Sequence, residues 1–273
     1  MPVRLEPWPT GTPAWVDLMV PDLDTARRFY SALFGWELTG QGDPATEMVY
    51  ITATKAGSAA AGIGSVPPGE VPPPARWTTY LATSDIEATT AAAADAGATV
   101  LVPPTTAEQS GRFALLADPA GAVVGLWQSG THTGADITDE AGSMTWNETM
   151  SRDVEAAQTF YATVFGYTYT DMSAPGFVYA SFAVDGRTAG GIGQITDDTG
   201  EQLDPHWLVY FKVDDVDDAL HTVTAMGGTV ARHAWDSPFG RIALVDGPAG
   251  ERFAIMADLV GQPAVDMDEA ATA

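Results

Sequence analysis

Near its start the chain changes from a two-residue hydrophobic period to a helical one. Residues 15–20 (WVDLMV) place three aliphatic side chains on one face and a tryptophan, an aspartate and a methionine on the other, which predicts a half-buried strand. Asp22 can then cap a helix, because apolar residues recur at three- and four-residue spacing as far as Phe34. Gly35 can end that helix. The pattern predicts a strand followed by a capped helix.

The same order of elements returns along the chain. Several short strands extend to Ile63, and a strand restarts at Thr78 after a stretch rich in proline and glycine (residues 65–76). Asp85 can cap an alanine-rich helix that ends near Gly97, and further strands follow. One strand, one helix and several strands thus occur four times. This order predicts an α+β fold, because doubly wound parallel folds alternate single strands and single helices.

The second half of the chain repeats the first. Residues 15–36 correspond without a gap to residues 146–167, at an offset of 131. The segment from Trp77 returns from Trp207, at an offset of 130. The segment GRFALLADPAGA returns as GRIALVDGPAGE, at an offset of 129. Segments in the same order with a slowly drifting offset indicate that a whole domain was duplicated, and the long period excludes a solenoid.

Composition excludes several classes of function. The 273 residues include 12 Lys+Arg against 36 Asp+Glu, which gives a net charge of −24 and leaves no basic surface for nucleic acid or an anionic membrane. Without cysteine there are no disulfides, thiolate metal sites or cysteine nucleophiles. We see no signal peptide and no apolar run of about 18 residues that could span a membrane. We therefore expect a cytoplasmic protein.

Two motifs carry a resemblance to a known family. The helix ending FYSALFGW at residues 29–36 and the segment SPFGRIALVDGPAG at residues 237–250 resemble the vicinal oxygen chelate superfamily. That superfamily contains glyoxalase I, extradiol dioxygenases, and fosfomycin- and bleomycin-resistance proteins. The resemblance covers about residues 10–258. The repeated W-x-[DE] strand openings are similar to a tandem-domain actinobacterial branch described as glyoxalase-like or hydroxylase-like.

The resemblance implies an α+β fold in which four βαβββ modules form two tandem vicinal-oxygen-chelate domains. Two modules of this family curl into a cup that holds the site. The expected boundaries are a first domain at 8–129 (modules 8–66 and 74–129), a linker at 130–143, a second domain at 144–260 (modules 144–197 and 204–260) and a tail at 261–273. Whether the first module pairs with the second, or with the fourth across the duplication, stays open.

Enzymes of this superfamily hold a divalent metal with His, Gln or Glu from the first and last strands of a module. The corresponding positions here are Trp15, Trp146, Thr78, Leu208, Gly125 and Ala254. None of these side chains is a ligand that a divalent metal prefers. A register error of one residue would restore only His206, and no two histidines have the spacing of a metal site. We therefore expect neither a metal site nor a cofactor.

One carboxylate per half is the candidate catalytic group. Asp17 and Glu148 would face an aromatic, apolar cup, which raises the pKa of a carboxyl and suits a general acid or base. In the alternative interpretation an arginine, Arg112 or Arg241, pairs with each carboxylate and only supports the fold. The candidate ligand-binding residues are Trp15, Met19, Tyr80, Trp127, Trp146, Met150, His206, Tyr210, Met256, Arg112 and Arg241.

Three functions remain open at this level. The first is a metal-independent enzyme that performs isomerisation, cyclisation or lyase chemistry on a natural product or a reactive carbonyl compound. The second is a non-catalytic protein that sequesters a drug or metabolite, for which the acidic chain and aromatic walls suggest a cationic planar ligand. The third is a metal-dependent glyoxalase or dioxygenase. All three predict a small-molecule ligand, no nucleic acid or membrane partner, and a monomer or homodimer.

Overall fold

The computed structural model describes residues 4–40, 43–66, 69–70, 74–196 and 203–259. The elements of the first half are β1 (Pro13–Val20), α1 (Leu23–Phe34), β2 (Tyr50–Lys55), β3 (Ser58–Ser65), β4 (Trp77–Ala82), α2 (Ile86–Asp95), β5 (Thr99–Ala107), β6 (Gly111–Ala117) and β7 (Val123–Ser129). Those of the second half are β8 (Met144–Ser151), α3 (Val154–Phe165), β9 (Thr168–Asp171), β10 (Tyr179–Val184), β11 (Arg187–Gln194), β12 (His206–Lys212), α4 (Val216–Ala225), β13 (Thr229–Ser237), β14 (Gly240–Asp246) and β15 (Arg252–Ala257).

Each half of the chain forms one mixed sheet, which confirms the α+β class. The strand orders are β2-β3-β1-β4-β7-β6-β5 in the first half and β13-β14-β15-β12-β8-β11-β10-β9 in the second. The antiparallel pairs β1/β4 and β8/β12 join two modules within each sheet. The first module departs from βαβββ, because where the third module has β9 its described part has only an isolated bridge between Glu37 and Thr54.

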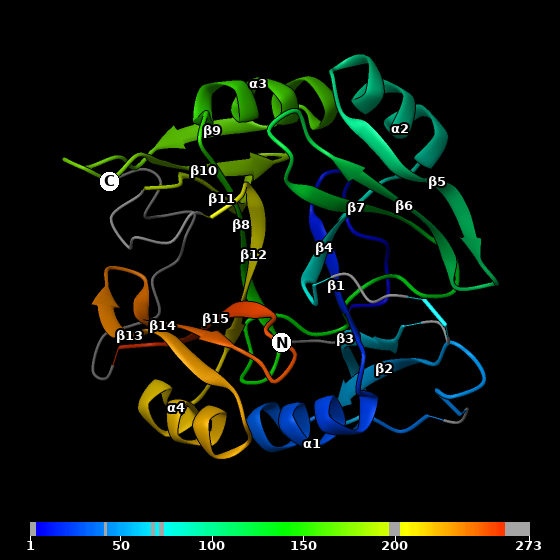
Figure 1. Ribbon diagram of the computed structural model, residues 1–273. Coiled ribbons are helices and arrows are strands. Elements are labelled where there is room, and N and C mark those ends of the chain that lie inside the picture. The colour runs from blue at the N-terminus through cyan, green and yellow to red at the C-terminus, as the bar shows by residue number, and fades with distance from the viewer. Residues whose placement is uncertain (1–3, 41–42, 67–68, 71–73, 197–202, 260–273) are drawn as a thin grey trace.

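The helices pair across the duplication. Helices α2 and α3 cover one end of the two sheets, and α1 and α4 cover the other (Figure 1). Strand β4 of the first sheet lies against β12 of the second. The first module is therefore joined to the second by strand pairing and to the fourth by helix packing, so both pairings left open by the sequence occur.

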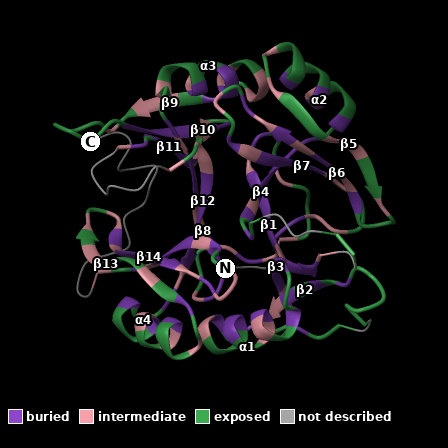
Figure 2. Cartoon of the chain, in the orientation of Figure 1, coloured by how far each residue is buried: buried purple, intermediate pink, exposed green. Residues whose placement is uncertain are grey.

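The hydrophobic core lies between the sheets and the helices that cover them, and it mixes residues of both halves. One cluster brings Phe34 against Phe211, with ring centroids 4.9 Å apart. The other combines Leu81 and Ile86 of the first half with Tyr161 of the second. Buried residues concentrate along the central strands, and the outer helix faces are exposed (Figure 2). Burial of this shared apolar surface holds the halves together.

Local sequence signals set the helix ends. Thr25 N donates to Asp22 Oδ1 at 3.0 Å, and Ala88 N donates to Asp85 Oδ1 at the same distance. The acidic run at residues 214–218 begins a helix in the same way, with Asp215 as the cap. Gly35 ends α1 at φ 70°, in the left-handed region that glycine adopts without strain.

The expected linker, residues 130–143, packs along the first sheet. Ala135 N donates to Ala14 O at 2.7 Å, and Ala59 N donates to Asp136 Oδ2 at 2.8 Å. Ile137 is buried in the core shared by both halves. The expected tail, 261–273, lies outside the described residues. Among the residues that are described, no helix is both long and apolar enough to cross a membrane.

Candidate functional site

A carboxylate bound by two phenols lies on the first sheet. Asp17 stands on β1 with its oxygen Oδ2 accepting from the hydroxyl of Tyr80 on β4 at 3.1 Å and from that of Tyr50 on β2 at 3.3 Å. Trp15 Nε1 donates to the Tyr50 hydroxyl at 2.9 Å. Strand alternation turns Asp17 away from the face of β1 that packs on α1. We call Trp15, Asp17, Tyr50 and Tyr80 the first carboxylate cluster.

The second sheet repeats this arrangement with a glutamate. Glu148 on β8 accepts from the Tyr179 hydroxyl at 2.8 Å and from the Tyr210 hydroxyl at 2.7 Å. Trp146 Nε1 donates to the Tyr179 hydroxyl at 2.9 Å. These four residues form the second carboxylate cluster. The predicted residues Tyr80 and Tyr210 thus donate to the two predicted carboxyl groups, and the predicted Trp15 and Trp146 donate to the other phenol of each cluster.

Burial raises the pKa of both carboxyl groups. Asp17 is 7% exposed, and desolvation raises its pKa to about 7 although the hydrogen bonds from Tyr80 and Tyr50 act to lower it. Desolvation likewise raises the pKa of Glu148 above its ordinary value, against the bonds from Tyr210 and Tyr179. The same burial raises the pKa of each phenol well above its ordinary range. The phenols therefore stay neutral donors while Asp17 changes its charge near neutral pH.

The interpretation in which an arginine neutralises each carboxylate is wrong. Arg112 Nη1 lies 2.5 Å from Glu87 Oε1 on α2. Arg241 pairs with Asp217 on α4 and with Asp236. Successive side chains of a strand point to opposite faces. The residue after each arginine lies on the face that carries the carboxylate cluster, so both guanidinium groups lie on the face covered by the helices. Neither arginine belongs to a carboxylate cluster.

The sequence analysis missed the two tyrosines that complete the clusters, Tyr50 and Tyr179. A Cβ atom at Gly62 would overlap the Tyr50 hydroxyl, and one at Gly191 would overlap the Tyr179 hydroxyl. The glycine-rich strands β3 and β11 are therefore needed so that each phenol can cross them to the carboxylate. The sequence did contain a signal for them, because the two tyrosines lie 129 residues apart and each is followed by a glycine-rich segment.

The other predicted residues surround the clusters in different ways. Met19 and Tyr50 both lie over Gly64, and Met150 and Tyr179 both lie over Gly193. Three further residues were predicted to bind a ligand. Trp127 donates from Nε1 to His132 O at 3.0 Å, and His206 Nδ1 lies 2.7 Å from Asp204 O. Met256 packs against the buried group that contains Tyr210.

The linker residue His132 belongs to the surroundings of the first cluster. Its ring meets Trp15 edge-on with centroids 4.3 Å apart, and meets Trp127 at 5.4 Å. Its Nε2 atom is buried with no hydrogen-bond partner among the described residues. Burial lowers its pKa, so the ring is neutral at pH 7. This histidine lies in the expected linker, residues 130–143, and was not among the predicted ligand-binding residues.

Comparison with known proteins identifies the family. Residues 12–126 and 134–255 both match the Glyoxalase/Bleomycin resistance protein/Dioxygenase superfamily. The chain belongs to this superfamily. It is 36% identical over 260 residues to "Putative glyoxylase CFP32" of Mycobacterium tuberculosis (94% of this chain, 98% of the relative). It is 33% identical over 266 residues to "Anthracycline biosynthesis protein DnrV" of Streptomyces peucetius (93% and 96%).

Solved structures of the superfamily share the fold at low identity. A Mn(II)-bound glyoxalase from Novosphingobium aromaticivorans superposes with a TM-score of 0.64 at 17% identity, covering 95% of this chain and 85% of that one. The 2,3-dioxygenase LapB from Pseudomonas sp. KL28 gives 0.63 at 15% identity, covering 94% and 98%. These structures confirm two tandem glyoxalase-like domains.

The metal that this superfamily implies does not fit the residues present. At the positions expected to supply ligands, Trp15 donates its only polar atom to Tyr50, and Gly125 and Ala254 carry no donor atom. Within the described part of the chain, no three His, Cys, Asp or Glu side chains gather closely enough to hold an ion. The one carboxylate in each cluster is bound by phenols instead. This donor set does not resemble a divalent metal site.

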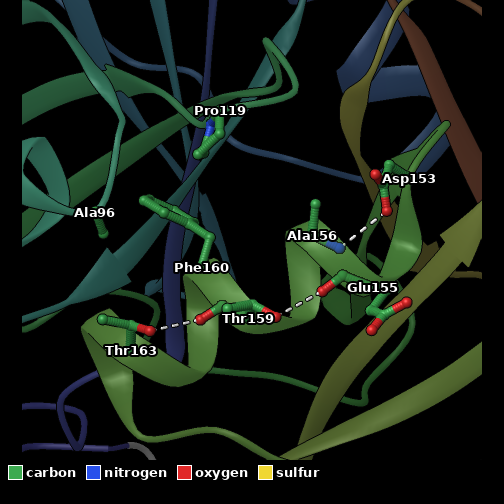
Figure 3. A pocket seen from close by; sticks show the side chains of 8 residues that line it. All are labelled: Ala96, Pro119, Asp153, Glu155, Ala156, Thr159, Phe160 and Thr163. Atoms are coloured by element: carbon green, nitrogen blue, oxygen red, sulfur yellow. Dashed lines mark hydrogen bonds between the residues drawn. The ribbon is translucent and has the colours of Figure 1, made fainter.

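A surface depression lies elsewhere, where α2 and α3 meet (Figure 3). It is lined by Ala96, Pro119, Asp153, Glu155, Ala156, Thr159, Phe160 and Thr163. Its polar groups already serve α3, because Ala156 N donates to Asp153 Oδ1 and Thr159 Oγ1 donates to Glu155 O. The depression therefore offers no chemistry comparable to that of the carboxylate clusters.

Proposed function

We propose that this superfamily member is a metal-independent enzyme that moves a proton on a small organic carbonyl compound, with Asp17 and Glu148 as the proton carriers. The observation that carries the proposal is the repeated site, in which a buried carboxyl group accepts two phenol hydroxyls and has no cationic partner among the described residues. The carboxyl, and not a resident metal, is the reactive group of each cluster.

The pKa of Asp17 suits this chemistry. A base removes a proton from a carbon most effectively when its pKa lies near the working pH, and burial raises that of Asp17 to about 7. As a carboxylate, Asp17 takes the proton beside the carbonyl, and the electron pair left on carbon delocalises onto the carbonyl oxygen. The carboxylic acid then returns the proton to another atom of the same molecule. The net result is isomerisation, which needs no oxidant or reductant.

The phenols position the carboxyl group and supply neutral hydrogen bonds. Tyr50 and Tyr80 hold Asp17 while they remain uncharged, so they do not repel an anionic intermediate. Trp15 fixes Tyr50 in turn through its indole N–H. A planar aromatic substrate is the class favoured by these rings. Two relatives named for anthracycline biosynthesis support an aromatic natural product as that substrate.

The proposal is tested by hydrogen exchange on a model ketone. The purified protein, dialysed against EDTA, is incubated with 1-tetralone in D2O, and loss of the proton signal beside the carbonyl is followed by NMR. We expect the wild type to accelerate exchange, and the double variant Asp17→Asn/Glu148→Gln to lose about 100-fold of that acceleration. Arg112→Gln, which removes a cation that lies outside the clusters, is the matched control and should keep it.

Each of the other outcomes would indicate a different function for the protein. Exchange that survives in the double variant would contradict the proposed proton carriers. Exchange that requires added Ni²⁺, Zn²⁺, Fe²⁺ or Mn²⁺ would indicate metal-dependent proton transfer of the glyoxalase kind. Quenching of tryptophan fluorescence by 1-tetralone without any exchange would indicate a sequestering protein.

A further inference from the structure

The two halves differ beside their carboxylate clusters, on the strand that forms the edge of the described sheet. In the second half, β13 brings Arg232 and Trp235 to the face that carries Glu148. Arg232 pairs across the strand with Leu244, and Trp235 pairs with Ile242. Cross-strand partners share a face of a sheet.

Those strand partners belong to the second site. A buried group of Leu208, Tyr210, Ile242 and Ala254 packs with Trp146, Trp235, Leu244 and Met256. The guanidinium carbon of Arg232 lies 3.9 Å from the centroid of the Trp235 ring, so the cation is stacked on the aromatic wall. Burial and the charge of Glu148 raise the pKa of Tyr210, and Arg232 is near enough for its positive charge to oppose that rise.

The nearby acids do not neutralise Arg232. Asp236 is bound by Arg241, and Asp246 is bound by Arg252. Among the residues that the structure describes, Arg232 itself has no ion pair, and it is exposed. A stacked and unpaired cation at an aromatic wall is an arrangement that recognises an anionic group on a planar molecule.

At the equivalent positions of β5, in the first half, neither an arginine nor a tryptophan is present. The equivalent positions, which pair with Leu115 and Phe113, are Val102 and Thr105. Near the first cluster the ring of His132 lies against Trp15 and Trp127 instead. The two halves therefore differ at this strand position, where the second half has a cation and the described residues of the first half have none.

We propose that Arg232 and Trp235 form the subsite that binds the anionic group, a carboxylate or phenolate, of a planar aromatic ligand, and that this subsite exists only in the second half. The chain then has one anion-selective site and one site for an uncharged group. This inference deepens the proposed function by naming the substrate class, but it concerns binding alone. It also departs from the cationic ligand that the net charge of −24 suggests, because a local contact determines what the site accepts.

The test compares two probes of the same shape. Quenching of tryptophan fluorescence is titrated with 2-naphthoate and with its uncharged counterpart 2-naphthamide, in 0.15 M salt, where the field of the acidic chain is screened beyond about 8 Å. We expect the wild type to bind 2-naphthoate about tenfold more tightly than 2-naphthamide. Isothermal titration should give one naphthoate per chain.

Variants at matched positions assign the preference. Arg232→Ala should remove the preference for the anion and leave 2-naphthamide unchanged. Arg232→Lys should keep part of it, because lysine retains the charge but not the planar stack. Val102→Ala, the same position in the first half, should keep all of it. Trp235→Leu should weaken the binding of both probes.

Three results would overturn the proposal. They are equal affinities of the wild type for both probes, no binding of 2-naphthoate up to millimolar concentration, and a preference that survives in Arg232→Ala. Because the readout is equilibrium binding, a failure here leaves the ketone exchange experiment untouched. Likewise, a loss of exchange in the carboxylate variants does not affect the comparison of the two probes.

Discussion

The two carboxylate clusters are built from equivalent segments but hold their carboxyl groups differently. Both phenols of the first cluster donate to the same oxygen of Asp17, at 3.1 and 3.3 Å. The longer Glu148 accepts one phenol on each oxygen, at 2.7 and 2.8 Å. One additional methylene thus converts a loosely held carboxyl into one with both oxygens bound.

The two clusters also differ in how far the tyrosine of β2 or β10 is exposed to solvent. Tyr50 is 45% exposed, whereas Tyr179 is 9% exposed. The ring of Phe177 stacks on Tyr179 with centroids 5.4 Å apart, and the equivalent residue of the first half is Met48. The first cluster is therefore the more open of the two at this phenol, although Trp15 is buried and Trp146 is partly exposed, and the second cluster is the more strongly hydrogen-bonded. A duplicated site can keep its donors while its access and rigidity change.

The halves also differ where they contact each other. Tyr161 of the second half donates to Asp118 Oδ2 of the first at 3.0 Å, and Tyr30 of the first donates to Glu251 Oε1 of the second at 2.6 Å. The two acids occupy different positions of the same turn, because Asp118 corresponds to Gly247. The Glu251 side chain fills the space that a Cβ atom at Gly247 would take.

The largest expected effect comes from breaking one of these contacts. Glu251→Ala leaves the Tyr30 hydroxyl buried without its acceptor and empties the space beside Gly247. We expect the free energy of unfolding to fall by about 3 kcal/mol. Urea denaturation followed by tryptophan fluorescence measures this loss.

A swap of the turn tests whether the two halves are interchangeable. Gly247→Asp/Glu251→Ala gives the second half the turn sequence of the first, whose Asp118 accepts three backbone N–H groups at 2.9 Å and the tyrosine. We expect the double variant to recover most of the stability that Glu251→Ala loses, as a double-mutant cycle would show. A double variant less stable than the single one would mean that the turns are not equivalent.

The next effect uses the raised pKa of Asp17. Between about pH 4 and 7 the folded protein keeps this proton while the unfolded chain releases it. The free energy of unfolding therefore falls as the pH rises through this range. Asp17→Asn cannot ionise. We expect the free energy of unfolding of the variant, relative to that of the wild type, to rise by about 2–3 kcal/mol from pH 4.5 to pH 8. Urea denaturation of both proteins at both pH values measures this change. The same stability difference between variant and wild type at both pH values would contradict the raised pKa.

The strand periodicity and the repeat predicted much of this comparison. Alternation along residues 15–20 placed Trp15 and Asp17 on one face, and the offset carried both to the second half, because successive side chains of any strand point to opposite faces. Tyr50 could not be placed in this way. Its contact with Asp17 depends on how β2 pairs with β3 and on the absence of a side chain at Gly62, which are both tertiary facts.

The pairing of the modules was beyond the sequence for a related reason. A repeat shows which segments are equivalent but not which copies meet. Strand pairing joins neighbours in the chain, whereas burial of the helix faces joins the first module to the fourth, and both are satisfied here. The arginine interpretation was wrong because Arg112 and Arg241 lie on the helix side of their strands, where acids of α2 and α4 bind them.

A smaller effect is expected where the halves differ by one methyl group. Tyr80 lies across Gly125, so a Cβ atom there would overlap its ring, whereas Tyr210 is paired with Ala254. Gly125→Ala should move Tyr80 toward the arrangement of Tyr210 at a cost of about 1 kcal/mol in unfolding free energy. Ala254→Gly is the reciprocal control. A loss of 3 kcal/mol or more in Gly125→Ala would show that the first cluster cannot adopt the geometry of the second.

The smallest effect separates the two carboxyl groups by the phenols that hold them. Tyr179→Phe removes the 2.8 Å bond to Glu148, and Tyr50→Phe removes the 3.3 Å bond to Asp17. Because these bonds lower the pKa of each acid, both substitutions should raise it. We expect the larger rise for Glu148, whose bond is shorter, and the smaller one for Asp17, measured by NMR titration of the ¹³C carboxyl signals. Equal rises would mean that the two carboxyl groups are held alike, and that the openness of the first cluster concerns access alone.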